Sequence, residues 1–343
     1  MEQTFKNKLE EIEVNIFKKR VISLLNEFND TEAYHIDYLS KREYVDNEPF
    51  LKSIKLIFKN QEYITVNSLN NNPIDKYYFK QLCDNITRIL VLSGETDINN
   101  NILNILLDKR SKYGKLKELD TFGYIAIIIK LTDKYNALSN IKDYSDLNNK
   151  SKIIETAYDY LGYLILLLES IPNISNEIYL REFNKFSNYN STQQDNEFEC
   201  RINNIVNSLF IESSHKIEYE RDTLIELINT EYEAGIKDTK FNNKMISLYC
   251  IILYRYICNL YIQEYKVSYK DLSKKIKDTL ISRNEQYNSS FHKQFVKFGI
   301  VSALLRLSNK HIRLLNQFKN GDNFEDTILD YLGYIVLIYN EFQ

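Results

Sequence analysis

The sequence is poor in the residues that interrupt helices. It has only 8 glycines and 3 prolines among 343 residues, whereas ordinary proteins use roughly 7% glycine and 5% proline. Because both residues disfavour helix interiors, their scarcity favours long helices. Tryptophan is absent, but 27 tyrosines, 18 phenylalanines and an apolar fraction of 44% can build a substantial core. No strict apolar–polar alternation spans the chain, so we predict an all-α protein.

The sequence lacks the motifs that identify several functional classes. The formal charge of −3 gives no basic surplus, so bulk electrostatics does not favour a nucleic-acid partner. The four cysteines show no CxxC spacing and the four histidines no HExxH motif, which argues against a zinc site. There is no P-loop, no dinucleotide-binding glycine motif and no Gly-x-Ser-x-Gly elbow.

Signals for export and for a membrane are also missing. The first residues, Met-Glu-Gln-Thr-Phe-Lys, do not resemble a signal peptide. The longest apolar stretch, residues 246–262, is interrupted by Arg255 and Asn259 and is too short and too polar for a spanning helix. We therefore predict a soluble, cytoplasmic chain without a membrane partner.

One pattern of residues occurs twice. Residues 122–134 match residues 298–310, which lie 176 positions later, and residues 155–163 match residues 326–334, which lie 171 positions later. This recurrence predicts an internal duplication: a helical bundle of two repeats related by a pseudo-two-fold axis, as in a covalent homodimer. A larger oligomer is left open.

The repeats suggest two helical units. We expect the first over residues 1–172, with its motif block at 102–170, and the second over 199–343, with its block at 269–342. Residues 173–198, rich in Asn, Ser and Gln, are predicted to be a linker or surface loop. Residues 54–66 can form a short strand or another helix. Helices are predicted over residues 1–43, 77–92, 102–113, 119–140, 151–170, 200–210, 215–234, 241–265, 269–287, 293–318 and 323–342.

The repeated helices are apolar on most faces, which places them at the centre of a bundle. Gly162 follows Asp159 by three residues and Gly333 follows Asp330 by three, on the same side of the helix. A position without a side chain there lets another helix approach, or leaves room for a ligand beside the carboxylate.

Acidic residues recur at matching places on the second repeated helix. Their i,i+4 spacing puts two carboxylates on one helix face, where they need a basic side chain or a metal ion as a partner. Oxygen-only sites suit Mg²⁺ or Mn²⁺; the alternative is a solvated or salt-bridged face. The preceding helix adds Asp133 in the first copy, but Asn309 in the second. The candidate metal ligands are Asp133, Glu155, Asp159, Asp326 and Asp330.

Basic pairs and tyrosines accompany the acids in both copies. The basic pairs can hold phosphate oxygens or neutralise the acids, and we expect both: an acid–base lattice that closes around a metal–phosphate ligand. The tyrosines that close the Leu-Gly-Tyr motifs can stack on a base, or can pack in the core or at its rim. The candidate substrate-binding residues are Lys130, Lys134, Arg306, Lys310, Tyr163 and Tyr334.

The order of motifs resembles a known family. In each copy a helix ends with Lys/Arg-x-x-x-Tyr (109–113 and 283–287), and the Phe-Gly block and the acidic helix follow. This order resembles two tandem copies of the nucleotide modification associated domain 1 family. More distantly, it is similar to the all-α nucleoside triphosphate pyrophosphatases of the MazG and dimeric dUTPase type. The resemblance covers the two motif blocks.

The resemblance implies a helical nucleotide-binding fold that is often found among phage and mobile-element genes. For the pyrophosphatases it also implies Mg²⁺ held by helix-borne carboxylates, with water attacking a phosphoanhydride. Those enzymes use an ExxE helix followed by an ExxD helix. Here the spacing is Glu155-x-x-x-Asp159, and the same unit has no clear ExxE partner.

Our leading hypothesis is a nucleotide-binding protein that acts on, or sequesters, a nucleoside phosphate with Mg²⁺ or Mn²⁺. As an enzyme it would be a pyrophosphohydrolase, in which Asp133, Glu155 and Asp159 hold the metal and activate water. One alternative is a non-catalytic nucleotide sponge or sensor in phage–host conflict, which Asn309 and the missing ExxE favour. The other is a purely structural helical scaffold.

Overall fold

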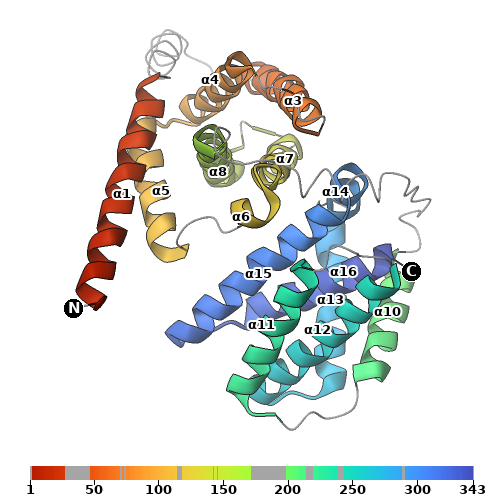
Figure 1. Ribbon diagram of the computed structural model, residues 1–343. Helices are drawn as coiled ribbons and strands as arrows, with labels where there is room; N and C mark the ends of the chain where they lie inside the picture. Colours follow the sequence, from red (N-terminus) through yellow and green to blue (C-terminus); the bar gives the residue numbers. More distant parts are fainter. Residues whose placement is uncertain are drawn as a thin grey trace. The chain divides into compact units, whose positions relative to one another are not determined.

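Helices make up all the regular structure in the part of the chain that the structure describes. The computed structural model (Figure 1) covers residues 2–27, 47–69, 72, 75–113, 118–141, 143–144, 146–170, 198–213, 219–237, 243–287 and 290–342. Within these ranges it has fourteen α-helices and no strand. The prediction of an all-α protein is therefore confirmed.

The chain divides into two compact units, Met1–Leu180 and Arg181–Gln343. We call them the N-terminal and C-terminal units and describe each by itself. The predicted linker, residues 173–198, lies outside the described residues except for Phe198, where a helix begins.

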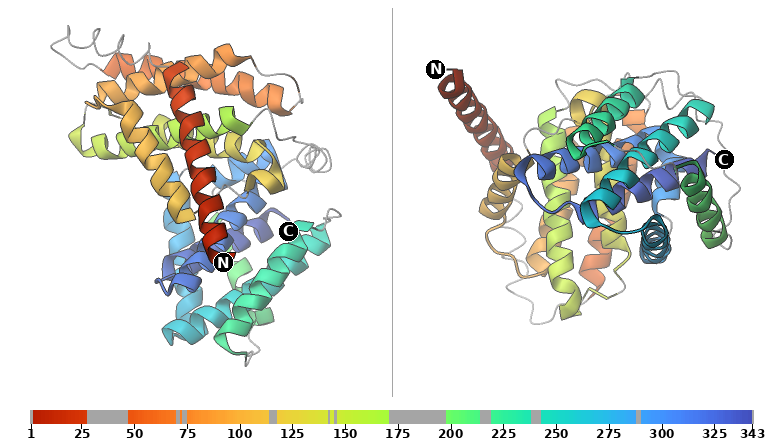
Figure 2. Two further views of the ribbon diagram at one scale, coloured as in Figure 1. Left: turned by 60° about the vertical axis from the view of Figure 1, so that its left-hand side comes forward. Right: turned by 90° about the horizontal axis from the view of Figure 1, so that it is seen from below.

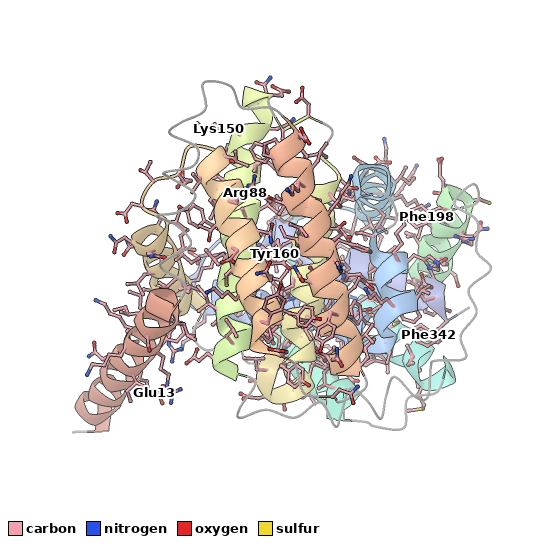
Figure 3. All side chains as sticks on the ribbon, turned by 90° about the horizontal axis from the view of Figure 1, so that it is seen from above. Glu13, Arg88, Lys150, Tyr160, Phe198 and Phe342 are labelled. Atoms are coloured by element: carbon pink, nitrogen blue, oxygen red, sulfur yellow. The ribbon has the colours of Figure 1, made fainter. Side chains whose placement is uncertain are left out.

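In the N-terminal unit, α7 and α8 pack against each other and are covered by the pair α3 and α4. Figures 1 and 2 show α1 lying beside α5. Tyr160 of α8 is fully buried and lies at the centre of this unit, beside α3 and α4, in Figure 3. The helices are α1 (Glu2–Glu27), α3 (Asn47–Leu69), α4 (Lys76–Leu92), α5 (Ile98–Tyr113), α6 (Glu118–Phe122), α7 (Ile125–Ser139) and α8 (Leu147–Ser170).

In the C-terminal unit, α16 packs against α12 and α15, and α10 and α13 also contact it. A further helix, α11, packs along α12. The helices are α10 (Phe198–Ser213), α11 (Arg221–Lys237), α12 (Asn243–Tyr265), α13 (Tyr269–Tyr287), α14 (Ser290–Phe298), α15 (Ile300–Asn320) and α16 (Glu325–Glu341). The repeated helices α7, α8, α15 and α16 carry long runs of buried apolar residues, as their sequences predict.

Two helices that the sequence predicts as continuous are each broken by a glycine. The predicted helix 119–140 is α6 followed by α7, and the predicted helix 293–318 is α14 followed by α15. Gly123 and Gly299 stand at the breaks with φ of 68° and 63°. Other residues adopt such backbone angles only at a cost. Each short helix therefore turns away from the axis of the long one and packs against it.

The other helix boundaries differ less from the predicted ones. Residues 54–66 belong to a helix, α3, and not to a strand, which settles the open alternative. Helix α5 begins at Ile98, four residues before the predicted start at residue 102. Helix α11 begins at Arg221, six residues after the predicted start. The predicted helical residues 28–43 lie outside the described residues.

The glycines of the repeated helices permit close packing of a neighbouring helix. A Cβ atom added at Gly162 would lie 3.4 Å from Leu106 Cδ2 of α5, and one added at Gly333 would lie 3.2 Å from Leu280 Cδ2 of α13. Of the two roles open to these positions, the structure shows the approach of a helix.

A third helical glycine, Gly235, lies closer to a neighbouring side chain than Gly162 and Gly333 do. This contact leads to a prediction for stability. A Cβ atom at Gly235 of α11 would lie 2.1 Å from Cε2 of the buried Tyr249 ring on α12. Overpacking a core costs about 1–3 kcal/mol, which exceeds the gain of roughly 1 kcal/mol in helix propensity. We expect Gly235→Ala to lower the free energy of unfolding by about 1–2 kcal/mol, measured by urea denaturation.

Gly162→Ala is the matched control, because its Cβ atom makes only ordinary van der Waals contacts with Leu106 and Ile102. It should leave stability unchanged or raise it by up to about 1 kcal/mol. Equal effects of the two substitutions would show that the Gly235–Tyr249 contact does not limit packing.

Candidate functional site

In the N-terminal unit one carboxylate lies between two lysines from neighbouring helices. Asp159 of α8 accepts a hydrogen bond from Lys134 of α7, with 2.6 Å between Oδ2 and Nζ. Its other oxygen, Oδ1, accepts one from Lys109 of α5. The Asp159 side chain is 16% exposed, so water screens these contacts only in part.

The two lysines decide the charge of this carboxyl group. Burial alone would raise the pKa of Asp159, but the hydrogen bonds and charges of Lys109 and Lys134 outweigh burial and hold the pKa below its ordinary value. The stabilisation that Asp159 gives is therefore present at neutral pH, above the unfolded pKa. It is lost as the pH falls through the folded pKa.

The C-terminal unit repeats the arrangement. Asp330 of α16 accepts a hydrogen bond from Lys310 of α15, with 2.7 Å between Oδ2 and Nζ. Its Oδ1 accepts one from Arg283 of α13. The matched residues thus come from α5, α7 and α8 in one unit and from α13, α15 and α16 in the other.

Lys310 lies near three arginines as well as the carboxylate of Asp330. Burial is the largest cause that lowers its pKa, and Arg313, Arg283 and Arg306 lower it further, to about 8. The pKa falls although Asp330 accepts a hydrogen bond from the same ammonium group, because burial and three cations outweigh one carboxylate.

A second ion pair extends the N-terminal arrangement. Lys130 of α7 lies 3.1 Å from Glu118 Oε1 of α6, and their side chains are only 10% and 6% exposed. The Lys130 ammonium also lies over the Tyr163 ring, 5.5 Å from its centroid. Burial raises the pKa of the Tyr163 hydroxyl, and the charges of Asp159, Glu118 and Asp133 raise it further.

In the C-terminal unit an arginine takes the place of Lys130 and donates to two neutral side chains. Arg306 of α15 donates to Gln294 Oε1 of α14 at 2.8 Å and to the Tyr334 hydroxyl at 3.4 Å. Its guanidinium carbon lies 5.6 Å from the Tyr334 ring centroid and 5.9 Å from that of Phe291. These distances allow cation–π attraction.

We define two clusters by these contacts and by the matching positions Asp133 and Asn309. The N-cluster consists of Lys109, Glu118, Lys130, Asp133, Lys134, Asp159 and Tyr163. The C-cluster consists of Arg283, Gln294, Arg306, Asn309, Lys310, Asp330 and Tyr334.

The predicted basic residues therefore have different partners. Lys134 and Lys310 contact the predicted acids Asp159 and Asp330, whereas Lys130 and Arg306 reach residues outside the predicted set. The tyrosines Tyr163 and Tyr334 lie beside these cations and are half-buried. Their roles in binding a substrate stay predictions.

The predicted metal ligands do not converge. Glu155 and Asp326 are exposed, and both oxygens of Asp159 and of Asp330 contact cations. Within the described ranges, no three His, Cys, Asp or Glu side chains form a group that could hold a metal ion. Carboxylates already paired with ammonium and guanidinium groups do not fit a magnesium site. The assignment of Mg²⁺ or Mn²⁺ stays a prediction.

Four residues of the clusters were missed as site candidates: Lys109, Arg283, Glu118 and Gln294. The repeat could have identified these residues as two matching pairs. Lys109 and Arg283 occupy the same position in the Lys/Arg-x-x-x-Tyr helix ends. Likewise, 118 and 294 each lie four residues before the Phe of the Phe-Gly block. A comparison of the residues just outside the repeated blocks would have found all four candidates.

One helix of the described residues is long and apolar enough to cross a membrane by length and composition. It is the segment Met245–Tyr265 of α12, with a mean hydropathy of 1.5. More than half of it is buried inside the protein, as in the core helix of a soluble protein.

Comparison with known proteins gives no relative. No protein-family model, no curated protein and no solved structure matches the chain. The resemblance to the nucleotide modification associated domain 1 family stays a prediction, and function is inferred from the two clusters.

Proposed function

We propose that the protein binds a nucleoside phosphate, whose phosphate groups contact the cations of the clusters. The observation that supports this most strongly is the C-cluster, where Arg283 and Lys310 contact Asp330 and where Arg306 lies close enough to Lys310 to lower its pKa. Burial and these neighbouring cations disfavour the charged form of Lys310, and a bound anion would stabilise that form. Guanidinium groups pair with two phosphate oxygens at once, and an ammonium group adds a point charge.

Aromatic rings beside the cations supply a surface for the nucleoside. Phe291 and Tyr334 have ring centroids 6.1 Å apart with a tilt of 27°, and both side chains are half-buried. Bases stack on such rings. A phosphate on Arg306 would therefore lie close to a stacking surface for the base that it carries.

We propose binding rather than hydrolysis as the main activity. The hydrolytic hypothesis needs carboxylates that hold Mg²⁺, but Asp159 and Asp330 serve as partners of cations. Asn309 cannot supply the charge that Asp133 supplies in the first copy. A sponge or a sensor for a nucleotide fits these donors better than a pyrophosphohydrolase does.

We also propose that the two units arose by internal duplication. The contacts of Asp159 with Lys109 and Lys134 recur in Asp330 with Arg283 and Lys310. The short helix–glycine–long helix order recurs as well, with positive φ at both glycines. A buried tyrosine follows each acid by one position, Tyr160 and Tyr331, and each donates or accepts a hydrogen bond in the core.

One incubation tests the proposed function. The purified protein is mixed with nucleoside mono-, di- and triphosphates, including cyclic and modified ones, with Mg²⁺ or Mn²⁺. Mass spectrometry then identifies products and ligands that stay on the protein after free nucleotide is removed. We expect a retained, unaltered nucleotide.

Two other outcomes contradict binding as the main activity. Release of monophosphate and pyrophosphate would establish the hydrolase. If there is neither product nor retained ligand, and no nucleotide raises the melting temperature, the ion pairs serve only a structural scaffold.

Lys310 gives the binding a pH dependence. Its pKa of about 8 means that it loses its charge just above neutral pH. Phosphate monoesters lose their second proton with a pKa of about 6, so their charge changes little above pH 7. Nucleotide affinity should therefore be steady near neutral pH and fall by at most about tenfold per pH unit as the pH rises through about 8.

Isothermal titration calorimetry across this range measures the effect. Lys310→Arg is the control, because arginine stays protonated throughout, so its affinity should not follow this pH profile. An unchanged slope in that variant would assign the pH dependence to another group.

A further inference from the structure

The outer face of α3 carries large apolar side chains that water reaches. Helix α3 packs against α4 and α7, and together with α4 it forms an outer layer of the N-terminal unit (Figure 3). On its exposed face Leu51, Phe58 and Val66 are 48%, 49% and 50% exposed. They are seven and eight residues apart, which is close to two helical turns each time, so the three side chains lie in one stripe along the helix.

Charged side chains lie within this stripe. Lys55 follows Leu51 by four residues and Glu62 follows Phe58 by four, so each stands on the same side of the helix as the apolar residue before it. A helix that lies on a lipid surface keeps its apolar residues on one side and its charges on the other. The mixture on α3 therefore suits a protein surface better than a membrane. We define the α3 face by Leu51, Lys52, Lys55, Phe58, Lys59, Glu62 and Val66.

A second copy of the same helix matches this mixture when it runs in the opposite direction. In a pair related by a two-fold axis between positions 58 and 59, residues at equal distances before 58 and after 59 face each other. Leu51 stands seven positions before 58 and Val66 seven after 59, so the two apolar side chains meet. Lys55 and Glu62 stand three positions before and after, so opposite charges meet. Symmetry repeats both contacts on the other side of the axis.

The centre of the pair and the alternative direction favour the same arrangement. Phe58 of each copy would face Lys59 of the other, whose apolar stem can cover the ring while the ammonium group stays in water. In a parallel pair each residue would instead face itself, so that Lys55 meets Lys55 and Glu62 meets Glu62. Like charges placed opposite each other disfavour an interface.

We propose that the α3 face binds the α3 face of a second copy of this chain, antiparallel, and that the protein forms a two-fold dimer through its N-terminal unit. The apolar side chains supply the affinity. Exposed ion pairs contribute little, and Glu62 also interacts within its own chain, so Lys55 and Glu62 select the direction and register. The face covers residues 51–66, a length of roughly 22 Å. This small interface should have a dissociation constant on the order of 1–100 µM.

Sedimentation equilibrium of the full chain measures the association. The weight-average mass should rise with concentration from 40.8 kDa towards twice that value. Phe58→Lys places a lysine against Lys59 of the second copy and should raise the dissociation constant about tenfold or more. Leu248→Lys is the matched control, because Leu248 is 50% exposed on α12 of the other unit. It should leave the dissociation constant unchanged.

A charge swap tests the direction of the helices. Lys55→Glu places two glutamates opposite each other on both sides of the axis, and Glu62→Lys places two lysines there. Each single variant should therefore weaken the dimer about tenfold. The double variant Lys55→Glu/Glu62→Lys restores opposite charges and should recover most of the lost affinity. A parallel pair would show neither effect, because each residue would still face its own copy.

Several results would overturn the proposal. They are a chain that stays monomeric up to about 100 µM, a dimer that Phe58→Lys leaves intact, and a dimer that Leu248→Lys dissociates. A monomeric chain that sediments with vesicles of phosphatidylcholine and phosphatidylserine would assign the α3 face to a membrane. Circular dichroism shows whether the variants fold. If Phe58→Lys does not fold, the charge swap decides, and single variants that do not weaken the dimer contradict the antiparallel pair.

Discussion

Replacing Lys130 with methionine should lower the free energy of unfolding of the N-terminal unit by about 3–5 kcal/mol. The side chains of Lys130 and Glu118 are 10% and 6% exposed, so the substitution leaves a buried carboxylate without its cation. An unpaired buried charge keeps its full cost of desolvation. Urea denaturation followed by far-UV circular dichroism measures the loss, with the two units treated as separate transitions where both are seen.

A double variant distinguishes two causes of lost stability: a buried charge that has no partner, and a loss of packing. Lys130→Met/Glu118→Leu removes both charges and keeps apolar volume, so it should recover most of the lost stability. Arg306→Met is the matched change in the other unit and should cost less, because Gln294 and Tyr334, to which Arg306 donates, are neutral and Glu118 is charged. Equal losses for Lys130→Met and Arg306→Met would contradict the charge argument.

Replacing Lys310 with methionine should weaken the binding of a nucleoside phosphate about 10- to 100-fold. A hydrogen bond between charged partners contributes roughly 1.5–3 kcal/mol, and 1.4 kcal/mol corresponds to about a tenfold change in affinity. Asp330 keeps Arg283 as its partner, so the fold of the C-terminal unit should survive. Calorimetric titration at neutral pH measures the loss.

Lys134→Met is the matched control in the N-terminal unit. Lys134 contacts Asp159 as Lys310 contacts Asp330, but it lies in the N-terminal unit, whereas the proposed function is argued mainly from the C-cluster. Its replacement should change nucleotide affinity less than twofold. A large loss in this variant, with none in Lys310→Met, would place the ligand in the other unit.

Much of the fold follows from the sequence because its signals are local. The scarcity of glycine and proline predicts long helices, and the apolar runs predict buried ones such as α7. The breaks at Gly123 and Gly299 were not predicted, because glycine is tolerated inside a helix and φ depends on the packing of both neighbouring helices. The same turns place α6 against α7 and α14 against α15.

The candidate site was predicted only in part, for a related reason. Contacts within the repeated blocks, such as Lys134 with Asp159, follow from helical spacing once two helices are assumed to pack. The contact of Glu118 with Lys130 spans 12 residues and depends on the turn at Gly123, which no helical period describes. Sequence reasoning could not choose between acids that hold a metal ion and acids that pair with lysines, because both use the same residues.

The two amides of the C-cluster also describe how easily such a chain can change in evolution. A codon for glutamate becomes one for glutamine by a single nucleotide substitution, and the same holds for aspartate and asparagine. The exchanges at Glu118 and Gln294, and at Asp133 and Asn309, keep the size of each side chain. Two point mutations therefore remove two carboxylates from such a cluster, so a lineage can change the charge beside these cations without rebuilding a helix.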